Sequence, residues 1–171
     1  MAKLRKFVAY RNLERPYTRV SKFRSKNFVR ARPGSKIVRF EMGNRSGTFD
    51  SKVELVTEAK GNVRHNALES ARITCNKFLE TRIPKQYHFK IRIYPHHILR
   101  ENPLAAGAGA DRMSTGMKMS FGKPIGVAAR VKQGQTVCEV MCNKEHIPIA
   151  KLALLRAAKK LPFSFRLKQS A

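Results

Sequence analysis

The sequence contains no tryptophan, only three cysteines and only 11 acidic residues among its 171. The cysteines are odd in number and irregularly spaced, which argues against a disulfide framework and is typical of a reducing compartment. No apolar run approaches the roughly 18 residues needed to span a bilayer. The first residues, MAKLRK, lack the apolar stretch of a secretory signal, so we expect a cytoplasmic protein.

Patterns typical of catalysis or metal binding are also lacking. The five histidines form no HExxH motif, and Cys138 and Cys142 have no second close pair, so we interpret the cysteines as structural. Acids are too scarce to nominate a general acid–base pair, and no serine lies in a nucleophile elbow. The glycines around Gly107-Ala-Gly109 and Gly122-Lys123 lack phosphate-loop spacing, and we expect no helix to begin immediately after either. We therefore predict no enzyme activity, no cofactor and no metal site.

Positive charge is what the chain has in excess. It carries 36 Lys and Arg against 11 Asp and Glu, for a formal net charge of +25. Such an imbalance indicates a polyanionic partner, because the isolated chain would repel itself. Nucleic acid is the first interpretation, and an anionic membrane surface is the second.

The charge is densest in residues 1–35, which we interpret as a basic N-terminal arm ended by the turn sequence RPGS. Tyr10, Tyr17, Phe23 and Phe28 are interleaved among its cations. Cations bind phosphates, and aromatic or guanidinium planes stack on unpaired bases, so the arm is a candidate RNA-binding segment. The alternative is a solvated, disordered tail. The candidate RNA-binding residues of the arm are Arg5, Lys6, Arg11, Arg15, Arg19, Lys22, Arg24, Lys26, Arg30 and Arg32.

Residues 36–171 have the organisation of one α+β domain. Apolar positions at helical spacing predict helices over 63–81, with Asn62 as its N-cap, and over 146–160. Ile149, Ala150, Leu152, Ala153, Leu155 and Ala157 are the apolar positions of the second helix. Alternation or short apolar runs predict strands over 36–40, 49–57, 87–94, 125–131, 135–141 and 163–167.

This order favours a mainly antiparallel sheet with both helices on one face. In the strand over 87–94, the alternation buries Tyr87 and every second residue after it. The other face then presents Lys90 and Arg92 to solvent or phosphate, and Lys123 and Arg130 are further candidate RNA-binding residues.

The internal segment 102–120 has no predicted core role. Ala105–Ala110 carries no side chain larger than methyl, so ordering it would recover little of the entropy cost. We expect a flexible finger ordered by a partner, with Arg100, Arg112, Lys118 and Lys123 supplying charge. Met113, Met117 and Met119 could pack on an irregular surface, or alternatively fold back onto the domain.

The finger and its flanks carry a family resemblance. YHFKIRIYP at 87–95, LRENP at 99–103, ADR at 110–112 and FGKPIG at 121–126 occur in order, with RHNALE at 64–69 and RAAKKLP at 156–162. The chain resembles, over about residues 37–165, the archaeal and eukaryotic form of the universal large-subunit ribosomal protein L16, also called L10e. It lacks the C-terminal extension typical of eukaryotic members, which points to an archaeal one.

The resemblance implies an α/β-hammerhead-type fold bound to large-subunit rRNA and to neighbouring ribosomal proteins, without homo-oligomers. It implies that the loop points towards the peptidyl transferase centre, beside A-site and P-site tRNA, and that the protein joins the subunit late in assembly. The tRNA-proximal residues would be Arg100, Asn102, Arg112, Met117 and Lys118.

Two other functions stay open at this point. One is a transient ribosome-assembly or RNA-chaperone factor, which would have the same charge. The other is an RNA-modifying enzyme, which would need a cofactor or nucleophile site that the sequence does not offer.

Overall fold

Two antiparallel sheets and two long helices make up the folded core of the computed structural model, which describes residues 5–12, 15–18 and 21–170. The larger sheet has the strand order β1-β4-β7-β2-β8, and the smaller has the order β3-β6-β5. The larger sheet contains β1 (Glu41–Gly43), β2 (Ser51–Thr57), β4 (Tyr87–Ile91), β7 (Thr136–Cys142) and β8 (Phe165–Ser170). The smaller sheet contains β3 (Gly61–Arg64), β5 (His97–Glu101) and β6 (Lys123–Val131).

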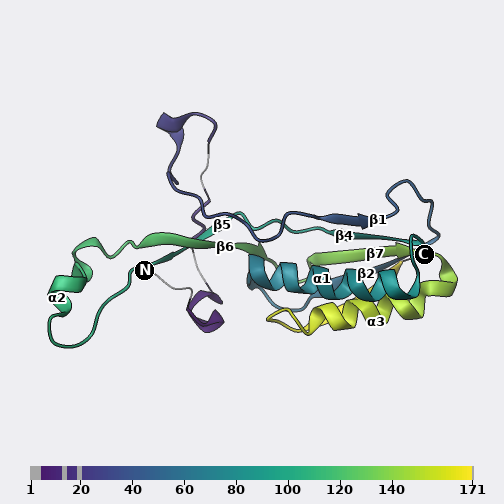
Figure 1. Ribbon diagram of the computed structural model, residues 1–171. Coiled ribbons are helices and arrows are strands. Elements are labelled where there is room, and N and C mark those ends of the chain that lie inside the picture. The colour runs from purple at the N-terminus through teal and green to yellow at the C-terminus, as the bar shows by residue number, and fades with distance from the viewer. Residues whose placement is uncertain (1–4, 13–14, 19–20, 171) are drawn as a thin grey trace.

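Helices α1 (His65–Arg82) and α3 (Ile147–Ala158) lie side by side on one face of the larger sheet (Figure 1). The apolar stripe of α1 is buried through Leu68, Cys75 and Leu79, and the alternate residues Val53 and Leu55 of β2 lie beneath the helices in the same core. The predicted α+β architecture, with mainly antiparallel pairing and helices on one face, is confirmed. The predicted alternation from Tyr87 to Ile93 is confirmed as well.

Two local predictions are wrong, and two strands were not predicted. The segment 36–40 is not a strand, because the pairing with β4 begins one residue later, at Glu41↔Lys90. Asn62 does not cap α1, since it lies inside β3, a strand that the sequence reading missed. The strand β5 was also missed, because its residues HILRE do not alternate in polarity. The helix N-cap is Arg64, without a side-chain capping bond.

The apolar face of α3 also differs from the prediction. Ala150, Ala153, Leu154 and Ala157 are fully buried, at the spacing i, i+3, i+4 and i+7. Leu152 and Leu155 are 53% and 45% exposed, so they lie outside the core. Pro148 is tolerated because it falls in the first turn, where an N–H would have no partner in the helix.

The predicted finger is the outer part of a long hairpin. Strands β5 and β6 pair antiparallel from His97↔Ala128 to Glu101↔Lys123 and project away from the helices (Figure 1). At the far end lie α2 (Ala110–Met113) and the 3-10 turn η3 (Gly116–Met119). The expectation that no helix begins after Gly107-Ala-Gly109 is therefore wrong, although α2 has only four residues.

The finger leaves the sheet at a position that only glycine fits. Gly122 has a φ of +80°, and a Cβ there would lie 2.7–2.9 Å from backbone atoms of Glu101 and Asn102. The two strands of the hairpin therefore come too close together at its root for a side chain on Gly122.

We predict that Gly122→Ala opens the root of the finger, because both the positive φ and the backbone clash oppose a side chain. The expected cost is about 1–3 kcal/mol, visible as faster amide hydrogen exchange in residues 98–101, 123 and 125–127. Gly116→Ala is the matched control, since Gly116 has a φ of +60° but no atom within 4 Å of the added Cβ. Equal protection in both variants would contradict this assignment.

Candidate nucleic-acid interface

The N-terminal arm packs on both faces of the β5–β6 ribbon. Tyr10, in the 3-10 turn η1 (Phe7–Tyr10), is buried against Leu99 and Ala128 on one face. On the other face Val29 packs against Ile98 and Val127, with Tyr17 alongside. In Figure 1, η1 and the arm loop carrying η2 (Arg24–Lys26) lie on opposite sides of the ribbon.

Hydrogen bonds fasten the arm at the same places. The buried Asn62 side chain donates to the Tyr10 carbonyl at 2.9 Å, and its backbone N–H donates to the Arg11 carbonyl at 3.1 Å. Ile98 N–H donates to the Tyr17 carbonyl at 3.0 Å. Arg5 Nε lies 2.7 Å from a Glu101 carboxylate oxygen. Asn62, expected as a helix cap, instead anchors the arm.

This packing divides the arm's aromatic residues into two groups. Tyr10 is 4% exposed, so it is not available to stack on a base. The Tyr17 ring lies edge-on to Phe28 and Phe121, at centroid distances of 5.5 and 5.3 Å. Phe23 and Phe28 remain more than 60% exposed. The described residues of the arm therefore do not form a free, solvated tail, because they pack on the ribbon.

Two of the expected tRNA-proximal residues hold the finger together: Arg100 at its root, and Asn102 by joining the root to η3. The Arg100 guanidinium lies 3.8 Å from the Phe121 ring centroid and 4.9 Å from that of Tyr17, and it donates to the Phe121 carbonyl at 2.9 Å. Asn102 donates to the Gly116 carbonyl at 3.2 Å. These contacts assign Arg100 and Asn102 a structural role that the spacing of charges did not predict.

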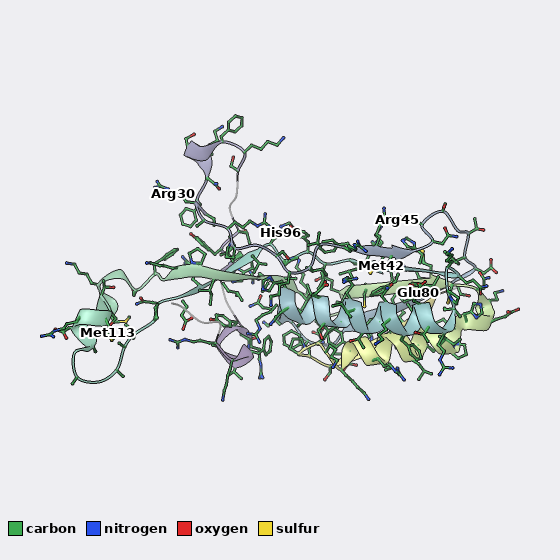
Figure 2. All side chains as sticks on the ribbon, viewed as in Figure 1. Arg30, Met42, Arg45, Glu80, His96 and Met113 are labelled. Atoms are coloured by element: carbon green, nitrogen blue, oxygen red, sulfur yellow. The ribbon has the colours of Figure 1, made fainter. Side chains whose placement is uncertain are left out.

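The other finger candidates are exposed at the far end. Arg112 and Lys118 are exposed, and Met113 and Met117 are 85% and 69% exposed. The alternative in which these methionines fold back onto the domain is therefore wrong for Met113 and Met117. Figure 2 shows Met113 at the end of the projection.

The two cations predicted on the sheet surface are both ion-paired. Lys90 Nζ lies 2.8 Å from Glu41, and this contact is the main reason that the pKa of Glu41 is lowered. Arg92 lies 3.4 Å from Glu139, a buried carboxylate that Lys52 also contacts at 3.0 Å. Arg92 keeps about half of its side chain exposed. Arg92 therefore pairs with a buried carboxylate while part of its side chain still faces solvent.

The remaining predicted RNA-binding residues lie on the arm and along the ribbon. Arg19 and the side chain of Arg24 lie outside the part of the chain that the structure describes. The exposed candidates are Lys6, Arg11, Arg15, Lys22, Lys26, Arg30, Arg32, Lys123 and Arg130.

A row of three rings joins the residue before β1 to the segment between β4 and β5. Tyr94 stacks on Phe40 at a centroid distance of 5.4 Å and contacts the His96 ring at 4.6 Å. Arg32 donates to the Tyr94 hydroxyl at 3.3 Å. The sequence placed Tyr94 on the outer face of its strand, but Phe40 and Arg32 meet it only through the tertiary fold.

The cysteines are buried within the sheet and α1, in agreement with a structural role. Burial raises the pKa of Cys75 well above its usual value and that of Cys138 to about 12, so both are held as thiols. Within the described ranges, no three His, Cys, Asp or Glu side chains gather as metal ligands. No helix among those residues is long and apolar enough to cross a membrane.

A small α+β core that extends a cationic arm and a long hairpin defines the class of basic proteins built to lie against a polyanion. The chain belongs to the ribosomal protein L16p/L10e family, whose pattern matches residues 14–168. It is of the archaeal type, as the sequence resemblance implied. The family is structural rather than enzymatic, in agreement with the predicted lack of catalysis.

Three relatives document the match, and each is called "Large ribosomal subunit protein uL16". That of Staphylothermus marinus is 52% identical over 153 residues, covering 89% of this chain and 84% of the relative. That of Hyperthermus butylicus is 49% identical over 154 residues, covering 90% and 82%. That of Methanococcus maripaludis is 49% identical over 161 residues, covering 93% and 90%.

One arm contact depends on pH. His97, which is 3% exposed, accepts a hydrogen bond from the Tyr17 N–H at Nδ1, at 2.9 Å. Burial, followed by the charges of Arg130 and Arg100, lowers the pKa of His97 to about 4. The neutral ring is required, because a protonated Nδ1 cannot accept this bond.

We predict that the stability contributed by neutral His97 is fully present above pH 6.5 and declines as the pH falls towards 4, since over that range only the unfolded chain binds the proton. The free energy of unfolding should fall by up to about 3 kcal/mol from this group. It is measured by amide exchange at Ile98, whose N–H also bonds the Tyr17 segment. In His97→Asn, whose side chain does not titrate, this component of the pH dependence should disappear; an unchanged profile would contradict the prediction.

Proposed function

We propose that this protein is a structural constituent of the large ribosomal subunit that binds rRNA through its arm and ribbon. The observation that carries the proposal is the family match combined with exposed cations on both projections. Phosphate contacts supply most sequence-independent affinity for RNA, and these contacts need side chains held outside the core.

We further propose that the tip of the finger, with Arg112, Met117 and Lys118, lies near tRNA at the peptidyl transferase centre. The tip is exposed and lies far from α1 and α3 (Figure 1). Arg100 and Asn102 would act indirectly, by holding the root. The α/β-hammerhead relationship and late entry into the subunit belong to the same proposal.

A transient assembly or RNA-chaperone factor is the second candidate, favoured only by the same charge. Sucrose-gradient profiles separate the two functions. Presence in stoichiometric amount in mature large subunits supports the structural role, whereas presence in precursors alone supports the transient one.

The salt dependence of binding tests the electrostatic interface. If about ten phosphate contacts form, affinity for large-subunit rRNA fragments should fall by roughly 10³–10⁵ between 50 and 200 mM salt. The double variant Lys22→Ala, Lys26→Ala should reduce the slope of log K against log salt by about two, because two contacts are removed. A slope near zero for the unmodified chain would refute the interface.

Removal of residues 103–119 tests the finger. We expect the core to fold and bind rRNA, because the pairing of β5 with β6 ends at Glu101↔Lys123. Subunits containing the shortened protein should use tRNA poorly or mature slowly. The control is the single variant Met113→Ala, which keeps the length of the finger and every proposed tRNA-proximal residue. Normal translation by subunits shown to contain the shortened chain would rule out the tip's role.

A further inference from the structure

We propose that the ring row formed by Phe40, Tyr94 and His96 is a stacking site for an unpaired RNA base. The inference rests on the proposed RNA-binding function and goes beyond it, because it identifies a base-contacting site outside the arm and the finger. The occupant is a single nucleobase extruded from, or adjoining, a helical RNA segment.

The row has one buried end and one open end. Tyr94 is its shared member: it stacks on Phe40 at an interplanar angle of 28° and contacts His96 at 48°. Phe40 is half-buried and packs against the main core, whereas His96 is exposed and Tyr94 is 41% exposed. Phe40 and Tyr94 are therefore stacked and His96 is tilted against them, so a base placed on the His96 face would extend an aromatic surface that is already assembled.

Backbone hydrogen bonds fix the segments that carry the three rings before any ligand arrives. The His96 backbone N–H donates to the Tyr94 carbonyl at 3.0 Å, and Pro95 between them is buried. The Phe40 carbonyl accepts from Ile91 N–H at 2.8 Å, which ties the first ring to the end of β4. Rigid rings lose little entropy on binding, so such a site favours stacking.

Basic residues lie near the row in space or in sequence. Arg32 donates to the Tyr94 hydroxyl, and its guanidinium lies 5.7 Å from the ring centroid. Arg92, two residues before Tyr94, is half-exposed, and Arg30 is exposed. Figure 2 shows Arg30 and His96 on the side of the molecule opposite α1 and α3. Phosphates on either side of a stacked base would meet positive charge there.

An unpaired base fits this site better than a duplex. Bases within an A-form helix have their faces covered by neighbours, whereas unpaired bases stack on aromatic side chains with little sequence preference. A cationic partner protein is disfavoured by the flanking arginines. The site therefore combines the ring faces and the charges that single-stranded RNA binding uses.

Two RNA probes and the full-length chain test the site: a short single-stranded RNA carrying 5-iodouridine, and a fully paired duplex of the same length. His96→Ala should weaken single-strand binding about 5- to 100-fold, the range for loss of one stacked base. His96→Phe should restore binding, because it keeps an aromatic ring that can stack on a base. Neither variant should change duplex affinity or the salt slope at pH 7.5.

Val38→Ala is the matched control, since Val38 is 78% exposed and lies two residues from Phe40 without contributing a ring. Photocrosslinking of the iodouridine strand should label Tyr94 or His96. Labels confined to the arm and finger, or equal losses in His96→Ala and Val38→Ala, would overturn the stacking site while leaving RNA binding intact. Failure of the unmodified chain to bind either RNA would instead overturn the proposed function, and the stacking site with it.

Discussion

The two-sided packing of the N-terminal arm on the β5–β6 ribbon is the constraint on which the projecting half of the molecule depends. A narrow ribbon extending from a sheet is marginally stable in water because both of its faces are wet. Here Tyr10 covers Leu99 on one face, while Val29 covers Ile98 on the other. Burying a large apolar side chain contributes roughly 1.5–3 kcal/mol, so each of these contacts offsets part of the entropy cost of ordering the ribbon.

The same packing links the charge of the chain to its shape. A concentration of positive charge repels itself, and only anchored segments can hold it in a defined place. The arm is anchored by buried rings and by Asn62, which leaves its lysines and arginines outside. The finger is anchored by Gly122 and by Arg100, which is enclosed by rings. The arm and the finger thus hold cations away from α1 and α3, and both segments are anchored to the folded core.

Acidic residues, though scarce, have specific structural roles. Glu139 is buried beneath Lys52 and Arg92, and Glu101 pairs with Arg5 at the base of the arm. A buried carboxylate needs such partners, because an unpaired charge in the interior is costly. Most of the positive excess therefore remains for an external polyanion.

The sequence by itself determined the class of fold, the course of α1, the alternation in β4, the family and the cationic character, because these depend on local spacing and composition. Only the tertiary structure decided which of the candidate residues are free to bind. Asn62 read as a helix cap, Tyr10 as a stacking residue and Arg100 as a contact of the finger, yet each holds two distant segments together. The contact of Phe40 with Tyr94 was equally hidden, since Phe40 precedes β1 and Tyr94 lies in the linker between β4 and β5. Local spacing carries no information about partners more than 30 residues away, and those partners decide whether a polar or aromatic side chain is used inside the molecule or left for a ligand.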